Sequence, residues 1–63
     1  MPELLTIGEA SAYLRIPIET LRQWRSRGVG PRSAKVGRHL RYRRAEIDRW
    51  LAEQEREPVG RAR

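Results

Sequence analysis

The sequence predicts a small, mainly α-helical domain that carries one short β-hairpin. Two segments, residues 7–14 and 17–28, repeat apolar side chains three and four positions apart, which is helical spacing. Residues 33–43 instead alternate apolar and basic side chains, which is the period of a strand. Residues 44–57 return to helical spacing, so the expected order is helix, helix, hairpin, helix.

The length and composition indicate one small intracellular domain. We expect this domain at residues 1–57, with 58–63 as a frayed basic tail. The sequence contains no Cys, which leaves no disulfide or thiolate metal site and fits a reducing cytoplasm. Neither a signal peptide nor an apolar span is visible, so we expect a cytoplasmic, nucleoid-associated protein without a membrane partner.

Positive charge is concentrated in one part of the chain. The formal net charge is +6, and nine basic residues with no acidic one lie between Arg22 and Arg44. Thirteen of the fourteen basic residues are Arg, whose forked donors suit phosphate better than simple solubility requires. A solvated surface is the alternative interpretation. We favour a surface that binds the phosphate backbone of a nucleic acid.

The first helix is expected to begin with a capping box. Thr6 can accept a hydrogen bond from the Glu9 amide while the Glu9 carboxylate accepts one from the Thr6 amide. Residues 1–5 are expected to be a lead-in, with Leu5 packing on this helix. Only residues 15–16 separate the first helix from the second, which favours a tight turn and a steep crossing, as in a helix-turn-helix unit.

The second helix has defined ends and two distinct faces. Pro17 suits its first position and Gly28 the position just past its end. Leu21 and Trp24 share the inner face. The outer face carries side chains that hydrogen-bond base edges, so we expect this helix in the major groove of duplex DNA. These residues are Glu19, Arg22, Gln23 and Ser26.

The hairpin is expected to present a basic outer face. Gly37 is the predicted turn, and an apolar face would pack on the helices with Trp24 and Trp50 as partners. The expected apolar face consists of Ala34, Val36, Leu40 and Tyr42, and the outward residues are Lys35, Arg41 and Arg43. The third helix buries Ile47, Trp50 and Leu51 and lacks a good N-cap, because Arg44 is not a capping residue.

This pattern resembles the MerR-like, excisionase-type winged helix-turn-helix domains of bacteria and their phages. The resemblance rests on LLTIGEASAYL at 4–14, TLRQWRSRG at 20–28 and KVGRHLRYRRAEIDRWL at 35–51. It implies that the second helix enters the major groove and that the hairpin is a wing on the adjacent backbone or minor groove. Pro17 and Ile18 depart from the family, which often has a Ser cap and a polar residue there. The long C-terminal coiled coil of full MerR-type regulators is also absent from this sequence.

The candidate site residues fall into three groups. The major-groove residues are Glu19, Thr20, Arg22, Gln23 and Ser26. The backbone residues are Arg25, Arg27, Lys35, Arg41 and Arg43. The wing-tip residues are Gly37, Arg38 and His39. Three roles remain open. Arg22 is either a base reader or a phosphate contact, and Glu19 either accepts from a cytosine amino group or caps the helix or pairs with Arg22. Thr20 either reaches a phosphate or hydrogen-bonds to the preceding turn of its own helix.

The sequence favours sequence-specific binding of double-stranded DNA and no enzymatic activity. There is no Cys nucleophile, and the lone His39 can build no metal site, so we expect neither a cofactor nor a metal. By resemblance the protein is an excisionase, a recombination directionality factor that binds cooperatively as head-to-tail copies and bends DNA for a site-specific integrase. The alternative is a small transcriptional regulator using the same surface. A basic protein-interaction or RNA-binding module is a more remote alternative.

Overall fold

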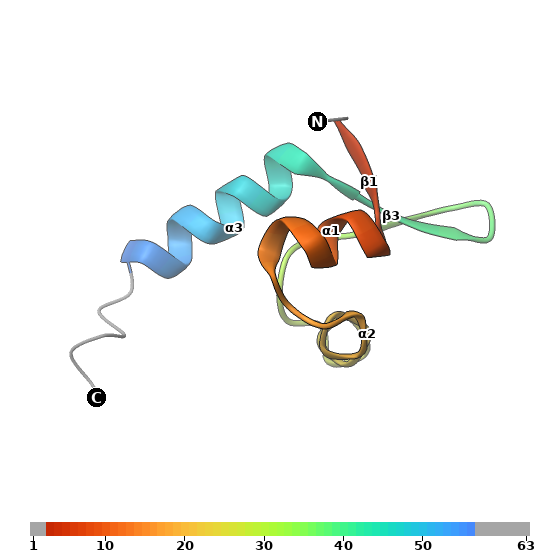
Figure 1. Cartoon of the computed structure of the whole chain (residues 1–63), viewed down its shortest axis with the longest axis horizontal. Coiled ribbons are helices and arrows are strands. Elements are labelled where there is room, and N and C mark those ends of the chain that lie inside the picture. The colour runs from red at the N-terminus through yellow and green to blue at the C-terminus, as the bar shows by residue number, and fades with distance from the viewer. Residues whose placement is uncertain (1–2, 57–63) are drawn as a thin grey trace.

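The computed structural model describes residues 3–56 as three helices and one three-stranded sheet (Figure 1). The predictions for residue 57 and for the tail at 58–63 lie outside these described residues. In chain order the elements are β1 (Leu4–Thr6), α1 (Ile7–Leu14), α2 (Ile18–Arg27), β2 (Ala34–Val36), β3 (His39–Arg43) and α3 (Arg44–Arg56). The predicted order of helix, helix, hairpin and helix is therefore confirmed, with one strand added before it.

The two halves of the helix-turn-helix unit form as the sequence predicts. Thr6 Oγ1 accepts from the Glu9 amide at 3.0 Å, and the Thr6 amide donates to Glu9 Oε1 at 2.9 Å, which completes the capping box. Figure 1 views α2 along its axis while α1 lies across the page, so the two helices cross steeply. The turn is closed by Ser11, whose hydroxyl donates to the Ile16 carbonyl at 2.6 Å and whose carbonyl accepts from the Ile16 amide at 3.1 Å.

One end of α2 differs from the prediction. Pro17 is the N-cap and not the first helical residue, because its ψ of 147° is extended although its φ of −57° would suit a helix. Its ring offers no capping side chain, and its carbonyl begins the helix by accepting from the Leu21 amide at 3.1 Å. At the other end Gly28 has a φ of 75°, as expected for a left-handed residue that ends a helix.

The sheet has a strand that the sequence did not predict. Residues 4–6 are not a lead-in but pair antiparallel with β3, giving the strand order β1-β3-β2. Leu5 lies opposite Tyr42, and both side chains are buried. A strand of three residues is too short to show an alternating pattern. The pairing instead follows from burial of Leu5 against the centre of the sheet.

The predicted face assignment of the hairpin is confirmed for β3, where Leu40 and Tyr42 face the core, and is wrong for β2. Gly37 and Arg38 form a two-residue turn, so Val36 pairs directly with His39 and shares its face. Ala34 pairs with Arg41 and lies on that outer face too, whereas Lys35 pairs with Leu40 on the inner face. Consequently Val36 is 52% exposed instead of buried. Continuous alternation across 33–43 would put Val36 and Leu40 on one face, but a two-residue turn reverses which positions share a face.

The core is small and joins every layer. It consists of Leu5, Ala10, Leu21, Tyr42 and Ile47, each at most 1% exposed. α3 begins directly after β3, and the Arg44 amide donates to the Glu3 carbonyl at 2.8 Å, which supplies a partner despite the missing N-cap. Trp24 of α2 and Trp50 of α3 pack against each other, with ring centroids 5.5 Å apart. The wing and α3 project in opposite directions from this core (Figure 1).

No helix within residues 3–56 is both long and apolar enough to cross a membrane.

Candidate nucleic-acid interface

The outward face of α2 is set by the burial of its opposite face. Leu21 is 1% exposed, and Trp24 packs against the same core, so the helix cannot rotate without uncovering both side chains. The outward residues Glu19, Arg22, Gln23 and Ser26 are exposed, and Thr20 is half-buried at the edge of this face. The predicted major-groove residues therefore lie on one surface of α2. Four of them are exposed there, and Thr20 is partly accessible.

A basic groove lies between α2 and the wing. This groove has a volume of about 390 Å³ and reaches the start of α1 at Thr6 and Ile7. No acidic side chain lines it. Uncompensated guanidinium groups around a concave surface create a positive potential that attracts anions, and a phosphate backbone above all. The remaining lining residues are Arg22, Arg25, Arg38, His39, Leu40 and Arg41.

The wing contributes to the groove from its tip and from β3. Arg38 is the second residue of the turn and is exposed, and His39 opens β3. Arg41 is half-buried, and its guanidinium donates to the Leu40 carbonyl at 2.8 Å, which fixes the side chain while leaving other donors available. The structure thus brings five of the predicted site residues, from α2 and the wing, around one concave surface.

Other predicted residues lie outside this groove. Arg27 at the end of α2 and Lys35 on β2 are exposed but do not line it. Arg43 contacts the Glu3 carboxylate at 3.6 Å, with both side chains mostly exposed, so the ion pair is weak. Arg43 instead borders a separate hollow beside Glu46 of α3. The predicted backbone group is therefore divided between different parts of the surface.

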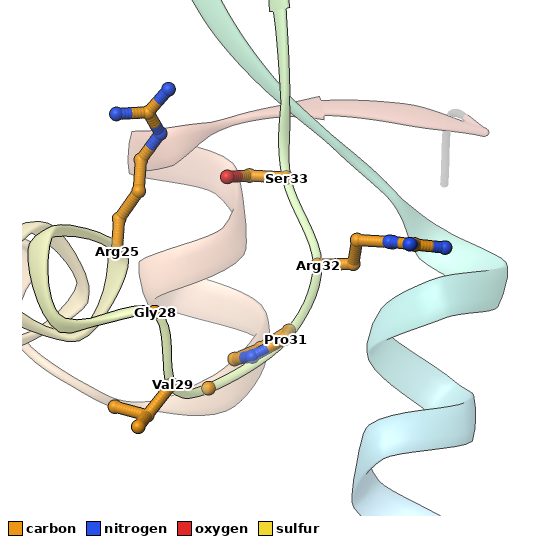
Figure 2. A pocket seen from close by; sticks show the side chains of 7 residues that line it. Arg25, Gly28, Val29, Pro31, Arg32 and Ser33 are labelled. Atoms are coloured by element: carbon orange, nitrogen blue, oxygen red, sulfur yellow. The ribbon is translucent and has the colours of Figure 1, made fainter.

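A second hollow adjoins the C-terminal end of α2 (Figure 2). It has a volume of about 340 Å³ and is lined by Arg25 and by loop residues 28–33. Ser33 lines this hollow, although nothing in the sequence marks it as functional. It opens the segment 33–43 that is predicted as the hairpin, and the Gly and Pro residues before it are typical of a connecting loop.

The Tyr42 hydroxyl belongs to the same neighbourhood. Burial raises the pKa of Tyr42, while the positive charge of Arg25 and a hydrogen bond with the Ser33 side chain act in the opposite direction. Arg25, Ser33 and Tyr42 come from α2, the following loop and β3, so only the folded chain unites them.

α3 is tied to α1 away from the groove. The Tyr13 hydroxyl donates to Asp48 Oδ1 at 2.6 Å, and this hydrogen bond is the main reason why the pKa of Tyr13 is raised. Arg44 Nε lies 3.7 Å from the other carboxylate oxygen of Asp48. These contacts set the orientation of α3 and leave the groove between α2 and the wing unobstructed.

The fold and the basic groove agree with a comparison against known families. The model of a helix-turn-helix domain matches residues 4–55, which is most of the chain. No curated protein matches the sequence. The matched span covers every element of the structure from β1 almost to the end of α3. The chain belongs to the helix-turn-helix domain family, a family of DNA-binding domains.

Proposed function

We propose that this protein recognises specific double-stranded DNA sites with α2 in the major groove and the wing on the adjoining backbone or minor groove. The observation that carries the proposal is the groove lined by Arg22, Arg25, Arg38 and Arg41, which lies beside the exposed polar face of α2 and has no acidic lining residue. A groove of this charge beside a protruding helix is complementary to a duplex, where a phosphate strand borders each groove.

Base recognition falls to α2. Arg22 can donate two hydrogen bonds to guanine O6 and N7, and Gln23 can pair with adenine N6 and N7. Glu19 is three positions from Arg22, so it either accepts from a cytosine amino group or orients the Arg22 guanidinium. Thr20 and Ser26 supply hydroxyl contacts at the edges of the same surface.

Affinity comes mainly from the cations around α2 and on the wing. The proposed backbone contacts are Arg25, Arg27, Lys35, Arg41 and Arg43. Arg38 is an exposed guanidinium at the wing tip, beside Gly37 and His39. A guanidinium at a narrow tip suits the negative potential of a narrow minor groove.

We further propose that the protein acts as an excisionase. The support is the resemblance of Val36–Arg43 and the flanking helices to excisionase-type domains, which load head-to-tail on repeated sites and bend DNA for a site-specific integrase. A transcriptional regulator would use the same surface, and the arrangement of the sites separates the two. Several direct repeats with a measurable bend support the excisionase, whereas one unbent site over a promoter supports the regulator.

The test of DNA recognition is selection of binding sites from a random duplex library, followed by affinity measurements for Arg22→Ala on every single-base variant of the selected site. We expect the substitution to cost about 1–3 kcal/mol and to relax preference at one base pair. Arg56→Gln is the matched control, because it removes a guanidinium at the far end of α3. An equal loss on all variants would make Arg22 a phosphate contact, and failure to select any site would refute sequence recognition.

A further inference from the structure

We propose that the hollow at the C-terminal end of α2 holds one phosphate group, with Arg25 and Ser33 as its ligands. This inference rests on the proposed DNA binding and deepens it, since the phosphate is that of a DNA strand leaving the groove beside α2. The sequence alone assigns no role to Ser33.

The placement of Arg25 joins this hollow to the basic groove. Arg25 lines both concave surfaces, one toward the wing and one toward loop 28–33. The phosphate backbone of a DNA strand that runs through the groove along α2 would therefore reach the hollow beside Arg25. Figure 2 shows the Arg25 side chain and the Ser33 hydroxyl on the same side of the loop, whereas Arg32 points to the opposite side, toward α3. One guanidinium and one hydroxyl thus face a common space.

The charge and donors in that space suit phosphate. No acidic side chain lines the hollow, so nothing neutralises Arg25 there. The amides of Gly28 and Val29 already donate to carbonyls of the last turn of α2, so they are not available as ligands. The ligands that we assign are side chains. A guanidinium supplies the charge, and a hydroxyl adds a directional hydrogen bond to a phosphate oxygen.

The decisive experiment is a methylphosphonate scan across the selected duplex, in which one phosphate at a time loses its charge. We expect one position at which wild-type binding falls and at which Ser33→Ala causes no further loss. On the unmodified duplex Ser33→Ala should weaken binding about threefold to tenfold. It should leave the slope of log affinity against log salt concentration (the salt slope) unchanged, because no charge is removed. Arg25→Gln should weaken binding more and reduce the slope by about 0.9.

Two further variants separate a direct role of the hydroxyl from general damage. Ser33→Thr keeps the hydroxyl and should restore affinity. Arg56→Gln is the charge-matched control for Arg25→Gln, because Arg56 lies at the end of α3 and lines neither the hollow nor the groove. It should leave the effect of each single methylphosphonate unchanged.

Each outcome decides between the hypotheses. The proposed phosphate site is wrong if Ser33→Ala weakens binding equally at every modified phosphate, or if it does not weaken binding at all. If Arg22→Ala still relaxes base preference in that case, the DNA-binding proposal stands. If no duplex binds, inorganic phosphate is titrated against the free protein at constant ionic strength. Saturable NMR shifts at Arg25 and Ser33 would then show that the hollow binds free phosphate. Without such shifts, the proposed phosphate site would be wrong.

Discussion

Replacing Gly30 with Ala tests how tightly the loop after α2 is held against the tryptophan pair. Gly30 has a φ of +81°, a conformation that L side chains rarely adopt. A Cβ at this position would also lie 2.7 Å from Trp24 Cε3 and 3.2 Å from Trp24 Cβ, well inside van der Waals contact. Trp24 cannot move away freely, because its ring packs on Trp50 and against the core.

The two effects can be added to give a magnitude. A left-handed backbone costs a non-glycine residue about 1–2 kcal/mol, and overpacking in a filled site costs about 1–3 kcal/mol. Gly30→Ala should therefore reduce the free energy of unfolding by about 2–5 kcal/mol. At about 0.05–0.15 kcal/mol per residue, a domain of this size is stable by only several kcal/mol, so much of the protein would unfold.

Gly28→Ala provides the matched control. Gly28 has a similar φ of +75°, but nothing lies within 4 Å of the Cβ position, so only the backbone cost of about 1–2 kcal/mol applies. Urea unfolding followed by far-UV circular dichroism measures both variants without depending on tryptophan fluorescence. If Gly30→Ala were no less stable than Gly28→Ala, the contact between the loop and Trp24 would not constrain the fold.

Three further predictions concern the cap, a tyrosine and the wing. Thr6→Ala removes half of the capping box and should lower the free energy of unfolding by about 1 kcal/mol in urea titrations. Tyr13 has a pKa raised by Asp48, so its stabilising contribution is complete below pH 10.0 and is lost as the pH rises through the folded-state pKa. A tyrosinate absorbance titration compared with that of Tyr13→Phe measures this shift. Arg38→Ala should weaken DNA binding and reduce the salt slope by about 0.9, with an unchanged circular dichroism spectrum.

Each of these predictions has a contradicting result. An unaltered urea midpoint for Thr6→Ala would mean that the cap adds nothing to stability. If Tyr13 ionised at or below its ordinary pKa, the hydrogen bond to Asp48 would not persist in solution. A salt slope that Arg38→Ala leaves unchanged would place the wing tip away from the phosphate backbone.

Features that depend on residues a few positions apart can be predicted from the sequence alone. The capping box of Thr6 and Glu9 spans one helical turn, so its pattern is visible in four consecutive residues. The faces of α2 follow from helical spacing, which puts Leu21 inside and Arg22 and Gln23 outside. The clustering of basic residues is also a property of the chain alone. These local patterns sufficed to predict three helices, a hairpin and a DNA-binding surface.

Features that join distant segments follow from how the whole chain packs. The pairing of Leu5 with Tyr42 depends on burial against the sheet, which no local pattern of three residues reveals. The hairpin faces depend on the length of the turn at Gly37, since a shift of one residue exchanges the two faces of a strand. Arg25 lines one hollow with Ser33 and another with Arg38 and Arg41, because packing brings α2, loop 28–33 and the wing together.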